Sequence, residues 1–332
     1  MCLVALSRNL PCPRPPPPPH TFARYALDCL SHHFREASKV NDYTDGFDSH
    51  HIAVPDGLKL HARIYGPGNE GLPIICLPGL SRNSRDFHQL ALQLSTAPTA
   101  PFRVITIDSR GRGLSEYDEK KERYSIPTEA HDVISVLNHF GIERAIFIGT
   151  SRGGLILHIL AATHPERLAG VLLNDIGPVI EIEGLKQIQD YLGRERRPKN
   201  FDDAAAILKE THGESFPALA GADWRDMAHA IYREIDGILI ADFDPAIAEL
   251  FRVADLREPI PDLWAQFDLF RALPLMTIRG ENSRLLSKKT TEIMAERHPG
   301  MQQLTALGQG HAPILHLGDV PAEIQRFLAG IR

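Results

Sequence analysis

Gly-Thr-Ser-Arg-Gly, at residues 149–153, is the stretch that decides the fold. It lies between an apolar run at 145–148 and a run of helical character at 155–163, so Ser151 is predicted to occupy a strand-to-helix turn. Glycines two positions before and after the serine permit a sharp bend that lifts its hydroxyl above the sheet edge. The helix start adds free N–H groups and a positive dipole end. The pattern predicts a serine activated for acyl transfer; the alternative is a capping serine in a glycine-rich turn.

Short, nearly continuous apolar runs recur along the chain and are separated by helical periods. Strands that are buried on both faces have this pattern, so a mostly parallel sheet is predicted. An antiparallel hairpin is expected at one sheet edge, where two alternating segments flank the turn Pro55-Asp56-Gly57. The hairpin strands are 51–54 and 58–65; the apolar runs are 74–77, 104–107, 145–148, 171–173 and 275–278; the first helices are 86–94, 128–140 and 155–163.

The alternation of apolar runs and helical periods stops at residues 178–262. We interpret this segment as an inserted helical cap without a convincing parallel strand. Its amphipathic segments are 185–192, 203–209, 224–235 and 246–253. The core pattern then returns with a helix at 288–297 capped by Ser287, a strand at 303–307 and a helix at 322–328. Aromatic side chains in the insertion predict an apolar wall of a cavity over the serine, although aromatic residues at helical spacing more often pack in a core. These residues are Tyr191, Trp224, Tyr232, Phe243, Phe251 and Trp264.

Composition excludes several classes of function. The chain has 332 residues, 43% hydrophobic and 23% charged, with a net charge of −6, so no electrostatic footprint for nucleic acid or membrane is present. No apolar run is long enough to span a bilayer. Residues 1–45 are expected to form a poorly ordered leader around Pro15–Pro19, and the cysteine pattern predicts a cytoplasmic protein without disulfides. No metal or cofactor motif occurs, and the oligomeric state is left open.

A serine nucleophile needs a base and oxyanion donors, which parallel sheets carry at the carboxyl ends of their strands. His311 follows the last predicted strand on a loop whose two glycines let the imidazole reach Ser151. The candidate oxyanion donors are the N–H groups of Leu80, after Pro78-Gly79, and of Arg152. Residues 108–115 alternate with glycine but lack a dinucleotide fingerprint; we predict that Asp108 and Arg110 form a structural brace.

Four segments together resemble the α/β-hydrolase superfamily: 77–80, 108–115, 149–153 and 310–311. The similarity covers roughly residues 48–332 and points to the capped branch with enol-lactonases, meta-cleavage hydrolases and small esterases. It implies a mostly parallel eight-stranded sheet flanked by helices, with a core at 46–177 and 263–332 and the cap at 178–262. By resemblance, Ser151 is the nucleophile, His311 the base, and Leu80 and Arg152 supply the oxyanion N–H groups. No cofactor is implied.

The third residue of the catalytic triad, the acid that orients the histidine, departs from the pattern of the superfamily. Similar enzymes usually carry it in the loop after the seventh strand, but Ser283 or Arg284 stands at that place and Glu281 is the only acid there. A second location in the fold, after the sixth strand, holds Asp175. We favour Asp175, with Glu281 as the alternative and neither as the third possibility. Loss of the orienting carboxylate can cost about 10⁴ in turnover.

The predicted function is hydrolysis of a small ester or lactone through an acyl-enzyme. Carbon–carbon bond hydrolysis of meta-cleavage products is the first alternative, and a catalytically weakened ligand-binding member, suggested by Arg284, is the second. The expected partner is an apolar small molecule, with a carboxylate if it pairs with Arg82, Arg85 or Arg152. The alternative is that these arginines are solvent-exposed surface residues with no role in binding.

Overall fold

The structure is a computed structural model that describes residues 43–192, 197–258 and 260–331. The predicted leader therefore lies outside the described residues up to position 42. Tyr43 is buried, and its hydroxyl donates a hydrogen bond of 3.0 Å to the carbonyl oxygen of Asp226. The chain from this point onward is the part that carries the sheet and the candidate site.

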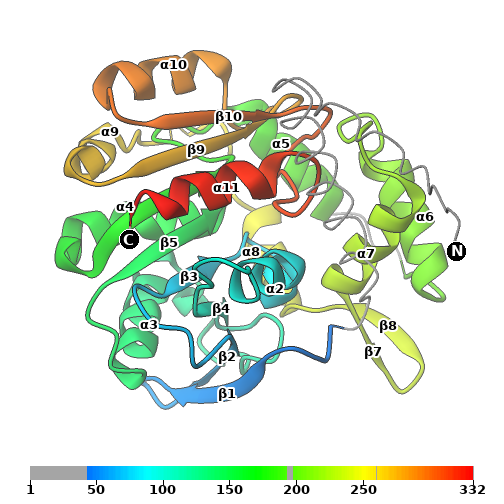
Figure 1. Ribbon diagram of the computed structural model, residues 1–332. Helices are drawn as coiled ribbons and strands as arrows, with labels where there is room; N and C mark the ends of the chain where they lie inside the picture. Colours follow the sequence, from blue (N-terminus) through cyan, green and yellow to red (C-terminus); the bar gives the residue numbers. More distant parts are fainter. Residues whose placement is uncertain (1–42, 193–196, 259, 332) are drawn as a thin grey trace, which may run out of the picture. The chain divides into compact units, whose positions relative to one another are not determined.

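An eight-stranded sheet forms the centre of this part, in the order β1-β2-β4-β3-β5-β6-β9-β10 (Figure 1). β1 pairs antiparallel with β2, and β2 with β4, whereas all other neighbours run parallel. The predicted edge hairpin and the mostly parallel sheet are confirmed. The strands are β1 (Asp48–Ala53), β2 (Lys59–Tyr65), β3 (Ile74–Leu77), β4 (Val104–Asp108), β5 (Ala145–Thr150), β6 (Leu168–Asn174), β9 (Leu275–Gly280) and β10 (Gln302–Ala306).

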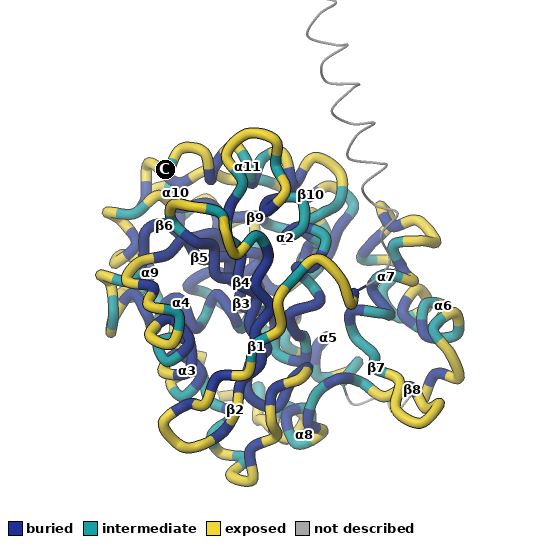
Figure 2. Tube along the Cα trace, turned by 60° about the horizontal axis from the view of Figure 1, so that its bottom comes forward, coloured by how far each residue is buried: buried dark blue, intermediate teal, exposed yellow. Residues whose placement is uncertain are grey.

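The central strands are buried on both faces, which explains their unbroken apolar sequences (Figure 2). Successive side chains of a strand point to opposite faces, so β3 places Ile75 and Leu77 in one apolar layer and Ile74 and Cys76 in the other. Helices α3 (Ile126–His139), α4 (Arg152–Thr163), α9 (Trp264–Phe267) and α10 (Lys288–Arg297) contribute to the first layer, and α2 (His88–Ser95) and α11 (Val320–Ala329) to the second.

Helix ends follow local capping chemistry. The Ser287 hydroxyl accepts from the N–H of Thr290, as predicted for the start of α10, and Ser125 caps α3 in the same way. Short 3₁₀ turns complete the connections: η1 (Ser84–Phe87), η2 (Lys121–Arg123), η3 (Pro165–Arg167) and η4 (Asp268–Ala272). Within the described ranges, every helix is too short or too polar to cross a bilayer.

Residues 178–262 lie between β6 and β9, two strands that pair with each other, and are called the inserted segment. This segment contains α5 (Ile182–Leu192), α6 (Phe201–His212), α7 (Gly221–Ile231), α8 (Pro245–Arg252) and a hairpin of β7 (Tyr232–Ile235) and β8 (Ile238–Ala241). The predicted helix at 224–235 is therefore wrong beyond Ile231. Asp236 and Gly237 both have positive φ, 50° and 77°, which is the geometry of a tight two-residue hairpin turn. This Asp-Gly turn favours a hairpin, so residues 232–235 form a strand although the apolar periodicity predicts a helix there.

Candidate active site

Ser151 occupies the turn between β5 and α4, with φ of 50° and ψ of −113°. Its neighbours must be small. A Cβ on Gly149 would lie 2.7 Å from the backbone nitrogen of Gly154, and one on Gly153 would lie 2.2 Å from the carbonyl oxygen of Leu77. A positive φ at a serine costs on the order of 1–3 kcal/mol, which the surrounding sheet and helix must offset. A side chain at position 149 or 153 would therefore clash with the backbone, which explains the two glycines of the sequence pattern.

Ser151, His311 and Asp175 form one chain of hydrogen bonds. The Nε2 atom of His311 lies 2.9 Å from the Ser151 hydroxyl, and its Nδ1 lies 2.7 Å from Oδ2 of Asp175. The loop that carries His311 is tied to the sheet, because the amide of Asn174 donates 3.0 Å to the carbonyl oxygen of Pro313. A proton can therefore pass between hydroxyl and imidazole while a carboxylate holds the far side of the ring.

Asp175 is fully buried and has a φ of 56°. Besides His311, its carboxylate accepts from the N–H of Gly280 at 2.8 Å and from the hydroxyl of Ser283 at 2.6 Å. Three donors on a buried carboxylate compensate for its lost hydration. The loop after β9, where similar enzymes carry an acid, here supplies a hydroxyl that holds an acid from the end of β6.

Glu281, the alternative acid, has a different partner. Its Oε2 accepts from the N–H of Gly308 at 2.7 Å, three residues before His311, and its own N–H donates to Ala306. The structure thus brings Ser151, His311 and Asp175 together, and it ties Glu281 to the start of the loop that carries His311.

The two predicted oxyanion segments both adjoin Ser151. Arg152 follows it directly at the start of α4, and a Cβ on Gly79 would lie 3.8 Å from the Ser151 Cβ. Among the described residues, the backbone N–H groups of Leu80 and Arg152 have no hydrogen-bond acceptor. Two such donors on either side of a serine hydroxyl are suited to bind a developing oxyanion.

A cavity of about 1110 Å³ opens over this chain of hydrogen bonds, with Ser151, His311 and Leu80 in its wall. The inserted segment supplies much of the remaining wall, including Tyr191, Tyr232 and Phe243. Trp224 packs instead in a small core within the insertion, and Phe251 and Trp264 pack on the main core. Three of the six predicted aromatic residues therefore line the cavity, and the other three pack in the apolar cores.

The three arginines considered for a substrate carboxylate are each paired within the protein. Arg152 is held by Glu129, and Arg85 by Asp242 at 2.6 Å. Arg82 forms a bidentate pair with Asp86 on the same surface, and its side chain is 27% exposed. Since Arg85 and Arg152 are less exposed, at 10% and 15%, Arg82 is the arginine of this set best placed to meet a ligand.

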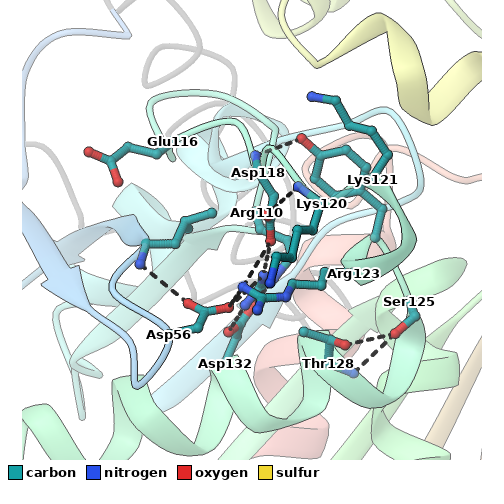
Figure 3. A network of polar contacts seen from close by, with 12 residues as sticks. Asp56, Arg110, Glu116, Asp118, Lys120, Lys121, Arg123, Ser125, Thr128 and Asp132 are labelled. Atoms are coloured by element: carbon teal, nitrogen blue, oxygen red, sulfur yellow. Dashed lines mark hydrogen bonds and ion pairs between the residues drawn. The ribbon is translucent and has the colours of Figure 1, made fainter.

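The predicted brace of Asp108 and Arg110 is two separate networks. Arg110 is surrounded by the carboxylates of Asp132, Asp118 and Asp56 (Figure 3). The carboxylate of Asp108 instead accepts from three groups that converge on it: Nδ1 of His61 at 2.7 Å, the N–H of Ser84 at 2.6 Å and the N–H of Leu114 at 3.0 Å. Both residues hold loops near the site, but they do so through different partners.

The cavity wall also contains an acid with an altered ionisation. Burial, reinforced by the nearby charge of Asp223, raises the pKa of Asp226 to about 6. Both residues belong to α7 and line the cavity. Sequence reasoning missed this pair, as it missed Ser283, Glu129 and Arg112, because only their spatial neighbours distinguish them from ordinary helix and loop residues. No group of three or more potential metal ligands occurs in the described part of the chain.

Comparison with known proteins identifies similar chains. A family model described as alpha/beta hydrolase fold matches residues 73–315. The 3-hydroxybutyrate-oligomer hydrolase of Cupriavidus necator is 30% identical over 247 residues, which cover 72% of this chain and 82% of that protein. The 2-(acetamidomethylene)succinate hydrolase of Mesorhizobium japonicum is 26% identical over 74% of this chain and 82% of its own. A solved alpha/beta hydrolase from Novosphingobium aromaticivorans is 37% identical with a TM-score of 0.79, covering 86% of this chain and 99% of that one.

Proposed function

Because this chain belongs to the alpha/beta hydrolase fold family, we propose that it is a serine hydrolase that cleaves a carboxylic ester through an acyl-enzyme. Ser151 is the nucleophile, His311 the general base and Asp175 the orienting acid. The observation that supports this assignment is the continuous chain of hydrogen bonds, 2.9 Å and 2.7 Å, that begins in the wall of a large cavity.

The proposed reaction has two halves. The Ser151 oxygen attacks the ester carbonyl as His311 takes its proton, and the N–H groups of Leu80 and Arg152 bind the oxyanion that forms. Collapse of this intermediate breaks the ester bond, and His311 returns the proton to the leaving alcohol. Water then attacks the acyl-enzyme with the same base, which releases the acid and restores Ser151. Asp175 keeps the imidazole in the tautomer that both halves need.

The substrate class follows from the cavity. We assign the insertion, 178–262, the role of a cap that encloses an apolar acyl or alcohol group between Tyr191, Tyr232 and Phe243. The volume of about 1110 Å³ exceeds what a two-carbon ester fills, so an elongated substrate is expected. Since a relative is named a 3-hydroxybutyrate-oligomer hydrolase, linear oligomeric esters of hydroxy acids are the first compounds to test.

The deciding experiment is covalent labelling with a fluorophosphonate, together with a panel of esters, lactones and oligomeric hydroxy-acid esters. Wild type should label at Ser151 and hydrolyse at least one ester, and Ser151→Ala should lose both properties. Turnover of a vinylogous diketone without ester cleavage would select the carbon–carbon alternative. An unlabelled wild type that still binds these compounds would identify a ligand-binding member.

A further inference from the structure

Glu129, in the first turn of α3, is a carboxylate with 1% exposure. It accepts hydrogen bonds from two guanidinium groups. Arg152 donates from Nε at 2.8 Å and from Nη2 at 2.9 Å, and Arg112 donates from Nη1 at 2.8 Å. Burial opposes ionisation, but the two arginine charges outweigh it and hold the pKa of Glu129 below its usual range. The three side chains therefore form one ionic cluster, and one of its members, Arg152, directly follows Ser151.

Each arginine of this cluster is connected to a residue that carries one of the two candidate oxyanion N–H groups, Leu80 or Arg152. Arg152 carries one of them on its own backbone, and its side chain is also fixed by the carbonyl oxygen of Tyr124 at 3.0 Å. Arg112 is fully buried, and its Nε donates 2.8 Å to the carbonyl oxygen of Leu80, the residue that carries the other. One carboxylate thus connects two segments that are 72 positions apart, residue 80 and residue 152.

We infer that Glu129 and Arg112 are positioning residues that set the distance and orientation between the Leu80 and Arg152 N–H groups. This inference rests on the proposed serine hydrolase function. Neither side chain touches the reacting atoms, so neither is a catalytic residue. Both act on the transition state through the two backbone donors, whose value depends on geometry matched to the oxyanion and not to the planar ester.

The loop of Arg112 also connects this cluster to the inserted segment. Arg112 forms a β-bridge with Phe243, and the N–H of Gly113 donates to Asp242 while the N–H of Asp244 donates to Gly111. Phe243 lines the cavity, so a segment of the cavity wall is bonded to Arg112, whose side chain holds Leu80. The cluster therefore connects the two candidate oxyanion donors to the segment that lines the cavity.

The test is Glu129→Gln, which keeps the shape of the side chain and removes its charge. We expect kcat to fall by about 10²-fold, the effect of a misplacement of the order of 1 Å, with little change in KM. The affinity for a boronic acid, which forms a tetrahedral adduct on Ser151, should fall by the same factor. The affinity for the matching planar amide should be unchanged.

Asp132→Asn is the matched control. Asp132 lies one turn further along α3, is similarly buried, and pairs with Arg110 instead of Arg112. It should lower the melting temperature and leave the ratio of boronic acid to amide affinity as in wild type. If Glu129→Gln does not fold, Arg112→Lys replaces it, since lysine cannot bond Leu80 and Glu129 together in the same fork.

A Glu129→Gln variant that keeps wild-type kcat, or that weakens both inhibitors equally, would overturn the positioning role. Ser151→Ala, measured in the same assay, separates this result from failure of the proposed function. If Ser151→Ala is inactive and Glu129→Gln is not impaired, only the positioning role fails. If Ser151→Ala retains full activity, the serine mechanism fails and this inference fails with it.

Discussion

Ser283 donates a hydrogen bond of 2.6 Å to the same carboxylate oxygen of Asp175 that lies 2.7 Å from His311. The two residues come from different strand ends: Ser283 follows β9, where the resemblance places the acid, and Asp175 follows β6. The loop that usually carries the acid carries a hydroxyl, which also accepts from the N–H groups of Leu285 and Leu286, both at 3.2 Å. A carboxylate at the end of β6 is therefore held by a hydroxyl on the loop after β9.

The assignment of Asp175 predicts a large difference between two variants. Asp175→Asn should lower kcat by about 10⁴-fold because the imidazole then rests in the wrong tautomer. Glu281→Gln keeps a side-chain oxygen that can accept from Gly308, so its kcat should stay near that of wild type. Steady-state kinetics on one ester decides the matter, and the reverse order of the two losses would make Glu281 the acid.

Ser283→Ala should reduce kcat by about tenfold, because Asp175 loses one of its donors and with it some orientation of His311. The melting temperature should also fall, since two backbone N–H groups lose their acceptor. Ser287→Ala, a few residues away, removes a helix cap and provides the control. It should cost about 1 kcal/mol of unfolding free energy and leave kcat unchanged. Equal kcat in the two variants would contradict the role given to Ser283.

Asp226 predicts a pH dependence in substrate binding. Its pKa is raised by burial and by Asp223 to about 6, so the carboxyl is neutral at pH 5 and becomes anionic as the pH rises to 7. The KM of an ester with a free carboxylate should rise over this interval relative to that of its methyl ester. In Asp226→Asn the ratio of the two KM values should not change with pH. A ratio that varies identically in both proteins would assign the effect to another group.

The same shift has a consequence for stability. Because the pKa of Asp226 is higher in the folded protein than its ordinary value, its contribution to stability is present at low pH and is lost as the pH rises through about 6. Asp226→Asn should therefore lose less stability than wild type between pH 5 and pH 7. Urea unfolding at the two pH values measures this difference.

Arg110→Met should destabilise the fold by about 3–5 kcal/mol, because it leaves the carboxylates around it buried without their common cation. Burial already raises the pKa of Asp132, against the effect of Arg110, and removal of the arginine raises it further. The loss of stability should therefore be smaller at pH 4.5 than at pH 7.5. Chemical denaturation at both values checks the sign, and a loss independent of pH would show that packing dominates.

Sequence reasoning recovered the fold because its signals are local. The apolar runs report burial of both faces of a strand, and the glycines around Ser151 report a turn that no larger residue fits. The helix predicted at 224–235 is wrong beyond Ile231, where two local signals compete: helical periodicity and the Asp236-Gly237 turn that favours a hairpin. Signals of this kind depend on neighbours in the chain and can be read without coordinates.

Only the tertiary structure shows which of the two candidate acids lies against His311. Residues 151, 175 and 311 are joined by hydrogen bonds across separations of 136 and 160 positions, and nothing in the local sequence of Asp175 or Glu281 encodes those distances. The pairing of Arg152 with Glu129 was hidden for the same reason. Backbone sterics and apolar periodicity were thus determined by the sequence itself, whereas hydrogen bonds between distant side chains required the packed sheet, because a shift of about 1 Å breaks them.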